Sequence, residues 1–181
     1  MGVLDVRGTH GSGKSWLVHQ LLESQTHKEL RDGKRILGYH LPTLDVAVVG
    51  KYTTACGGCD GVGSADEVVR RVRTFANDYR HVVLEGILVA HTFQRYSDLA
   101  FEMSDYGYTF FFLDTPLDVC IERVQSRRAA KGQKALESTH NIEHDHKQIW
   151  TNVRTKMKKA GHKVIELPYQ NPRGLFLKEL G

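Results

Sequence analysis

Apolar residues recur along this chain in two patterns, helical repeats and short continuous runs. The clearest helical repeat follows Ser64, where six apolar residues would share one helix face. They are Val68, Val69, Val72, Phe75, Ala76 and Tyr79. A second repeat predicts a helix over residues 14–24, and apolar runs predict buried strands over residues 3–7, 81–84 and 108–113. Strands that alternate with helices predict a parallel sheet covered on both faces, and therefore an α/β fold.

Weaker signals complete the expected set of elements. Ser64, followed by Glu67, predicts a capping box, and Thr115 is expected to cap a helix that has Pro116 at its first position. The absence of repeats and linkers in the sequence predicts a single domain over residues 1–181. The other elements are extended runs at 35–41 and 46–52, helices at 92–104, 116–130 and 138–160, a strand at 163–167 and a short helix after residue 172.

A phosphate-binding loop follows the first predicted strand. Residues 8–15 match the pattern G-x-x-x-x-G-K-[ST] in full. They are Gly8, Thr9, His10, Gly11, Ser12, Gly13, Lys14 and Ser15. Glycines let backbone N–H groups approach phosphates, and the helix that begins at Lys14 adds its positive end. The pattern predicts ATP as cofactor, with Lys14 on the β- and γ-phosphates and Ser15 as a ligand of Mg²⁺.

Arginines on a later helix indicate which class of phosphate-loop protein this is. The sequence has no guanine-reading N-K-x-D run, which argues against a GTPase. Arg123 and Arg127 are four residues apart, and Arg128 and Gly132 follow. Guanidinium groups stabilise the charge that spreads over a transferring phosphoryl group. We therefore expect a kinase with a three-layer sandwich fold and a helical lid at about 123–137, in which Arg123 and Arg127 are catalytic and Arg128 binds the nucleotide.

Three carboxylates are candidates for the chemistry at the acceptor. Glu85 ends a buried strand, where it could hold Mg²⁺ or orient the attacking hydroxyl. Asp60 is a candidate general base in an expected substrate loop at about 42–63, and Asp45 competes with it for that role. The sequence leaves the choice of base open.

The Gly-rich segment from Cys56 to Asp60 admits three interpretations. Zinc would need about four ligands, and the third cysteine, Cys120, falls in a predicted helix. A redox dithiol is a second possibility, although Cys-x-x-Cys motifs of that kind normally open a helix. We favour a tight loop beside the substrate, with the metal and redox interpretations kept as alternatives.

Charge and cysteine usage narrow the partners and the compartment. The net charge of +4 and three clusters of basic residues favour an anionic partner, either nucleotide or nucleic acid. The sequence shows no signal peptide and no apolar stretch long enough to span a membrane. Three cysteines favour a reducing cytoplasm over a disulfide framework. The oligomeric state is not indicated.

The order of these motifs resembles the thymidylate-kinase-like phosphate-loop kinases and, more narrowly, the phage DNA 5-hydroxymethyluridine kinases. The motifs that carry the narrower resemblance are residues 7–15, Val49-Gly50-x-Tyr52, Cys56-Gly57-Gly58-Cys59-Asp60 and Leu84-Glu85-Gly86. The resemblance implies ATP-dependent phosphorylation of 5-hydroxymethyluracil within phage DNA, in the host cytoplasm. A kinase of free nucleosides or nucleotides and a non-catalytic nucleotide-binding regulator remain alternatives.

Overall fold

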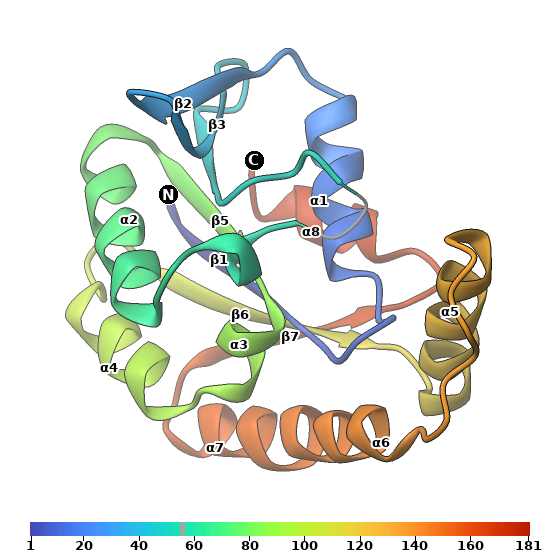
Figure 1. Ribbon diagram of the computed structural model, residues 1–181. Helices are drawn as coiled ribbons and strands as arrows, with labels where there is room; N and C mark the ends of the chain where they lie inside the picture. Colours follow the sequence, from blue (N-terminus) through green and yellow to red (C-terminus); the bar gives the residue numbers. More distant parts are fainter. Residues whose placement is uncertain (55–56) are drawn as a thin grey trace.

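The computed structural model describes residues 1–54 and 57–181. Its centre is a seven-stranded sheet in the order β2-β3-β4-β5-β1-β6-β7 (Figure 1). The five strands from β4 to β7 in this order are parallel, whereas β3 runs antiparallel to both of its neighbours. The strands are β1 (Gly2–Arg7), β2 (Lys28–Asp32), β3 (Arg35–Leu41), β4 (Val46–Val49), β5 (His81–Glu85), β6 (Tyr108–Asp114) and β7 (Lys163–Pro168).

Helices cover both faces of this sheet, which confirms the expected α/β fold. One face packs against α2, α3, α4 and the helical segment that ends in α7, whereas α1 and α8 cover the other face (Figure 1). The helices are α1 (Lys14–Glu23), α2 (Ala65–Asp78), α3 (Ile87–His91), α4 (Gln94–Glu102), α5 (Leu117–Ala130), α6 (His140–Lys147), α7 (Arg154–Lys159) and α8 (Pro172–Lys178), with a π-helical stretch at Gln148–Val153 and a 3₁₀ turn at Cys59–Gly61.

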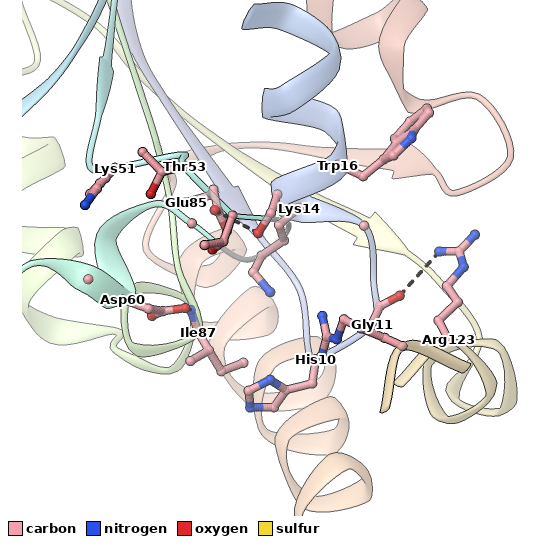
Figure 2. A pocket seen from close by; sticks show the side chains of 16 residues that line it. His10, Gly11, Lys14, Trp16, Lys51, Thr53, Asp60, Glu85, Ile87 and Arg123 are labelled. Carbon is pink, nitrogen blue, oxygen red and sulfur yellow. Dashed lines mark hydrogen bonds between the residues drawn. The ribbon is translucent and has the colours of Figure 1, made fainter. Parts of the chain in front are cut away.

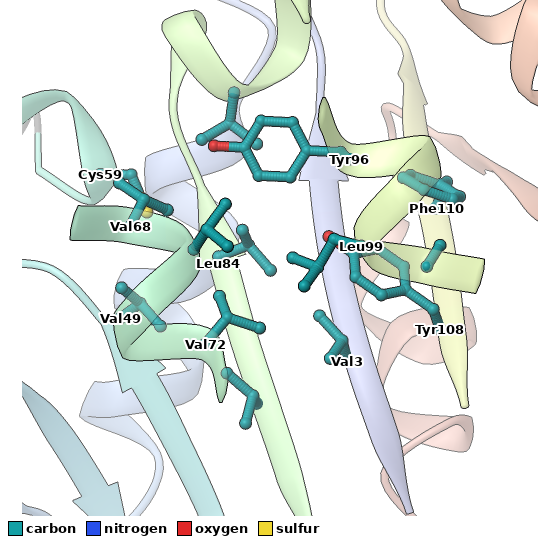
Figure 3. Packing of buried hydrophobic residues seen from close by; sticks show 14 of the residues in the cluster. Val3, Val49, Cys59, Val68, Val72, Leu84, Tyr96, Leu99, Tyr108 and Phe110 are labelled. Atoms are coloured by element: carbon teal, nitrogen blue, oxygen red, sulfur yellow. The ribbon is translucent and has the colours of Figure 1, made fainter. Parts of the chain in front are cut away.

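Side chains of the central strands alternate between two cores. In β6, Phe110 and Phe112 join the core under α2 and α4, and Phe111 and Leu113 join the core under α1 and α8. Figure 3 shows the first core, in which Leu84 and Phe110 pack with residues of the helices. This burial on both faces explains why the strands read as continuous apolar runs in the sequence.

A buried ion pair lies inside the first core. The Arg7 guanidinium donates to both carboxylate oxygens of Asp5, at 3.1 and 2.8 Å, and to the Thr92 carbonyl at 3.0 Å. The Tyr108 hydroxyl also donates to Asp5 at 3.1 Å, and the Tyr96 ring lies beside the guanidinium. Burial raises the pKa of Asp5, although Arg7 opposes the shift. The pair is fully satisfied, and it fixes β1 against β6 and the turn before α4.

The structure corrects several of the expected elements. Strand β2 was not predicted, because its residues are mostly exposed and show no apolar alternation. The extended run expected at 46–52 ends at Val49, and the helix expected at 92–104 is α4, with the short α3 before it. The expected substrate loop therefore includes a central strand, β4.

Two of the expected helix caps have different outcomes. Ser64 accepts from the Glu67 backbone N–H at 3.1 Å and caps α2, as predicted, but the Glu67 side chain pairs with arginines instead of closing a capping box. Thr115 does not cap α5: Pro116 occupies that position, and the Thr115 hydroxyl donates to the Ser12 carbonyl at 2.8 Å. None of the helices in the described ranges is long and apolar enough to cross a membrane.

Replacing Asp5 with Ala is expected to lower the free energy of unfolding by about 3–5 kcal/mol, because it leaves the Arg7 charge buried and unpaired. Urea denaturation measures this loss. The double variant Asp5→Leu/Arg7→Met, which removes both charges, should lose less than the single variant. A loss below about 1 kcal/mol for Asp5→Ala would contradict this account of the pair.

Candidate active site

The phosphate loop joins β1 to α1 and wraps around the Lys14 side chain. Gly11 and Gly13 adopt positive φ angles of 76° and 103°, which reverse the chain before α1 begins. The Lys14 ammonium donates to the Gly8 and Thr9 carbonyls at 2.8 and 3.0 Å. Lys14 is buried, and desolvation lowers its pKa. The ammonium is thus held inside the curve of the loop.

Helix α5 packs directly on this loop. A Cβ atom on Gly11 would lie 2.3 Å from the Cys120 carbonyl oxygen, so only glycine permits the contact. The Arg123 guanidinium donates to the Gly11 and Ser12 carbonyls at 3.4 Å each, as Figure 2 shows for Gly11. Arg127 lines the same cleft. The structure therefore brings Arg123 and Arg127 to the phosphate loop.

Arg128 is placed differently from its two neighbours. Its guanidinium donates to the Lys134 carbonyl at 2.8 Å, and it is absent from the cleft lining in the described part of the chain. Arg128 thus braces the segment after α5 in this structure, and its contact with a nucleotide stays a prediction.

Glu85 lies at the carboxyl end of β5, beside the end of β1. Its side chain is fully buried, and Oε1 accepts from the Ser15 hydroxyl at 3.0 Å. Among the described residues, Oε2 accepts no hydrogen bond, and the buried Tyr52 hydroxyl, which interacts with this carboxylate, also has no hydrogen-bond partner. Burial raises the pKa of Glu85 to about 7, although Lys14 and Ser15 oppose the shift. A carboxylate that is buried and short of donors is suited to receive a cation or a proton.

Gly58, in the Gly-rich segment, is packed against Glu85. Gly58 pairs with Lys51 through a backbone hydrogen bond of 3.1 Å. With φ at 83°, Gly58 approaches so closely that a Cβ atom there would lie 2.3 Å from Glu85 Oε1. The glycines therefore allow the loop backbone to cover the carboxylate, which is the tight-loop interpretation of the sequence.

The cysteines of this segment carry less information. Cys59 is buried, and desolvation raises the pKa of its thiol well above the usual value. In residues 1–54 and 57–181 no group of three or more His, Cys, Asp or Glu side chains could hold a metal ion. Cys56 lies outside the described residues, so the zinc and redox interpretations remain untested.

The two candidate bases lie at opposite ends of the sheet. The Asp60 carboxylate accepts from the backbone N–H groups of Ile87 and Leu88, at 2.9 and 3.2 Å, and lines the cleft. Asp45 precedes β4, and its carbonyl accepts from His81 at the start of β5. Asp45 thus lies at the amino ends of the parallel strands, whereas the cleft lies at their carboxyl ends. Asp45 therefore lies away from the cleft and Asp60 lines it, and the role of Asp60 as general base stays a prediction.

Asp145 and three histidines form a network beside the phosphate loop that the sequence did not reveal. Asp145, on α6, lies 3.5 Å from the imidazole of His10, 3.2 Å from that of His91 and 3.7 Å from that of His144. Burial and then Lys14 lower the pKa of His10. The network links the loop to α3 and α6, elements that lie far apart in the sequence. No motif relates Asp145 to residue 10, so sequence reasoning had no signal for it.

The phosphate loop, Glu85, Asp60 and the arginines of α5 surround one cleft of about 730 Å³ (Figure 2). Lys14 and His10 line it from the loop, Asp60 lies opposite them in the Gly-rich segment, and Lys51 lines its outer edge. A second cavity of about 400 Å³ adjoins it and shares Trp16 and Arg123 with it. The paired cavities give room for an elongated ligand and a second molecule.

Comparisons with known proteins bear on this cleft. The family model of the 5-hmdU DNA kinases matches residues 2–167. The chain belongs to this family. A 5-hmdU DNA kinase of Pseudomonas phage PaMx11 is 35% identical over 171 residues, which cover 91% of this chain and 89% of the relative. A 5-hmdU DNA kinase of Pseudomonas phage M6 is 27% identical over 181 residues, with 94% and 92% covered.

The structural comparison is more distant. A gluconokinase from Sinorhizobium meliloti 1021 has a TM-score of 0.49 at 15% identity and covers 99% of this chain and 89% of its own. The match to the 5-hmdU DNA kinase family confirms the resemblance drawn from the motifs, and it includes the phosphate loop, the Gly-rich segment, Glu85 and α5. The sequence-based interpretation of the chain as a kinase is thereby confirmed.

The raised pKa of Glu85 predicts a pH-dependent stability difference between this kinase and its Glu85→Gln variant. The folded-state pKa of about 7 exceeds the ordinary value of 4.5, so the stability that the protonated carboxyl contributes is lost as pH rises through this window. Gln carries no such charge. We expect Glu85→Gln to gain about 2–3 kcal/mol relative to wild type between pH 5 and pH 8. Urea denaturation at both pH values checks this, and an equal difference at both would contradict it.

Substitution of Gly58 tests the contact with Glu85. In Gly58→Ala the new Cβ atom must displace the carboxylate or the loop, and we expect the rate of phosphoryl transfer to fall about 10²-fold. Gly63→Ala is the matched control, because nothing lies within 4 Å of a Cβ atom at that exposed site. Similar rates for the two variants would show that the close packing on Glu85 is irrelevant to activity.

Proposed function

We propose that this protein transfers the γ-phosphoryl group of ATP to the hydroxymethyl group of 5-hydroxymethyluracil within DNA. One observation carries the proposal: the Ser15–Glu85 hydrogen bond joins a complete phosphate loop to a buried carboxylate, in a chain of the 5-hmdU DNA kinase family. The relatives' names supply the acceptor, and the cleft supplies the donor chemistry. The reaction would take place in the cytoplasm of the infected host.

The two adjoining cavities support the binding of ATP. The phosphates would lie on the backbone N–H groups of the loop, with Lys14 between them. The adenine base would enter the 400 Å³ cavity, where Trp16 and Tyr169 offer apolar faces. The Arg123 guanidinium lies over the Tyr169 ring, 5.8 Å from its centre, and it would bridge base and phosphates.

The side-chain oxygens of Ser15 and Glu85, where α1 meets the end of β5, suit Mg²⁺. The Ser15 hydroxyl and Glu85 Oε2, which accepts no hydrogen bond from residues 1–54 or 57–181, are hard oxygen ligands of the kind that this ion prefers. Mg²⁺, when bound, neutralises phosphate charge. Glu85 would then be ionised, since a nearby cation favours the carboxylate over the carboxyl form.

The transfer itself requires a base and positive charge. The hydroxymethyl oxygen forms a bond to the γ-phosphorus, while the bond from that phosphorus to the bridging oxygen of the departing ADP breaks. Asp60 would accept the hydroxyl proton, because two backbone N–H groups hold its carboxylate at the cleft wall. Lys14, Arg123 and Arg127 would stabilise the charge on the transferring group.

The target base must leave the stack of a duplex, or be met in a single strand, to reach this cleft. Residues 51–54 and 57–61 line the side of the cleft opposite the loop and would contact the base. Because only these residues would contact the base, the base could be recognised while its nucleotide remains part of the DNA strand.

The direct test offers γ-labelled ATP and Mg²⁺ with four acceptors in parallel. They are single-stranded DNA containing 5-hydroxymethyluracil, the same DNA containing thymine, 5-hydroxymethyldeoxyuridine and its monophosphate. We expect label on the hydroxymethylated DNA alone. Label confined to the free nucleoside or nucleotide would replace the proposal with a free-nucleotide kinase, and ATP binding without labelling of any acceptor would indicate a regulator.

Variants assign the steps of this reaction. Lys14→Met and Asp60→Asn are each expected to lower kcat about 10²–10³-fold, through lost charge stabilisation and lost proton transfer. Asp45→Asn is the matched control, since Asp45 lies at the other end of the sheet. Thermal unfolding curves verify that each variant is folded. Wild-type kcat in Asp60→Asn would remove this residue from the mechanism.

A further inference from the structure

A second basic cavity opens beside the catalytic cleft. Its volume is about 330 Å³, and it lies between the β2–β3 hairpin and α2. Five cationic side chains line it, namely Arg31, Lys34, Arg35, Lys51 and Arg71. Lys51 and Gly61 line both this cavity and the cleft, so the two are neighbours. A ligand long enough to leave the cleft on this side would enter the basic cavity.

Arg71 places a buried hydrogen-bond donor in the wall of this cavity. The residue is 2% exposed, its Nε donates to Glu67 at 2.8 Å, and its Nη1 donates to the Leu37 carbonyl at 2.9 Å. Its Nη2 is buried and has no acceptor among the described residues. A buried donor left without an acceptor is costly, so a group that accepts from Nη2 is favoured in the cavity.

Acidic residues around the cavity offset only part of its charge. Glu67 pairs with Arg70 and Arg71 and lies 4.0 Å from Arg35, while Glu29 pairs with Arg31. Asp32 lies at the end of β2. In the described ranges neither the Lys34 nor the Lys51 ammonium has a carboxylate within 4.0 Å. Five cations thus face three carboxylates, and the surplus favours an anion.

We propose that this cavity binds a backbone phosphate of the DNA strand that carries the target base. This inference rests on the proposed function and extends it, because it assigns a position to the strand outside the cleft. A phosphodiester supplies acceptor oxygens for Arg71 Nη2 and charge for Lys34 and Arg35. A free nucleoside in the cleft has no phosphate, and a 5′-monophosphate has only its own. A phosphate of the adjoining nucleotide, bound in this cavity, therefore favours a polymeric acceptor.

Charge neutralisation on the hairpin tests this assignment. We compare wild type with Lys34→Gln/Arg35→Gln and with the control Lys156→Gln/Lys159→Gln. The control removes the same charge on α7, which packs beside β7 at the edge of the sheet opposite the hairpin. Fluorescence anisotropy gives the Kd of a single-stranded oligonucleotide over a range of salt concentrations. The hairpin variant is expected to bind about tenfold more weakly at 50 mM salt, with the slope of log K against log salt reduced by about 1.4. ADP binding should not change.

A second variant and a competitor separate phosphate binding from a loss of folding. Arg71→Lys keeps one charge but lacks the second N–H group of the fork, and it should weaken DNA binding about threefold to tenfold while the unfolding temperature shows that it is folded. Wild-type oligonucleotide affinity in both variants would overturn the proposal. An equal loss of DNA affinity in the α7 control would also overturn it. Pyrophosphate is the competitor, and a hairpin variant that loses pyrophosphate binding but keeps its DNA affinity would overturn the proposal as well. Weakened DNA binding in a protein that phosphorylates no DNA would instead retain this site and reject the proposed function.

Discussion

The hydrogen bond from Ser15 to Glu85 is the contact on which the site depends. It joins the first turn of α1 to the end of β5, and so connects the phosphate loop to the neighbouring strand of the sheet. The carboxylate is fully buried, and Lys14 is the nearby positive charge that most favours its ionised form. Gly58 packs so closely against it that no residue with a Cβ atom fits at position 58. Within the described part of the chain Glu85 Oε2 accepts no hydrogen bond, so the ionised form is costly until a cation binds.

The phosphate loop is held from several sides by residues outside the loop, in addition to the hydrogen bonds that Lys14 makes within it. Thr115 and Arg123 bind loop carbonyls from α5 and the turn before it, while the histidine network of Asp145 connects the loop to α3 and α6. Below it, the buried pair of Asp5 and Arg7 fixes β1. A rigid loop of this kind costs little to order when phosphates bind, which is the condition for strong electrostatic stabilisation.

How much the sequence could predict varies with the range of the interaction. The loop, the position of Glu85 and most helices follow from local patterns, because glycine spacing, apolar periodicity and strand ends are local properties. Strand β2 could not be predicted, since its stability comes from pairing with β3 and its side chains are mostly exposed. The role of Asp145 and the different placement of Arg128 depend on contacts between distant segments. Asp45 and Asp60 looked equivalent until the topology assigned them to opposite ends of the sheet.

The central claim is that Glu85 is a carboxyl group whose burial keeps it partly protonated near neutral pH in the free protein. Carbon-13 NMR of the side-chain carboxyl, assigned with the Glu85→Gln spectrum and followed from pH 4 to pH 9, measures this directly. The account predicts an apparent pKa of about 7, well above the ordinary 4.5. A titration near 4.5 would show that solvent or the Tyr52 hydroxyl satisfies the carboxylate, and it would contradict the account of this site.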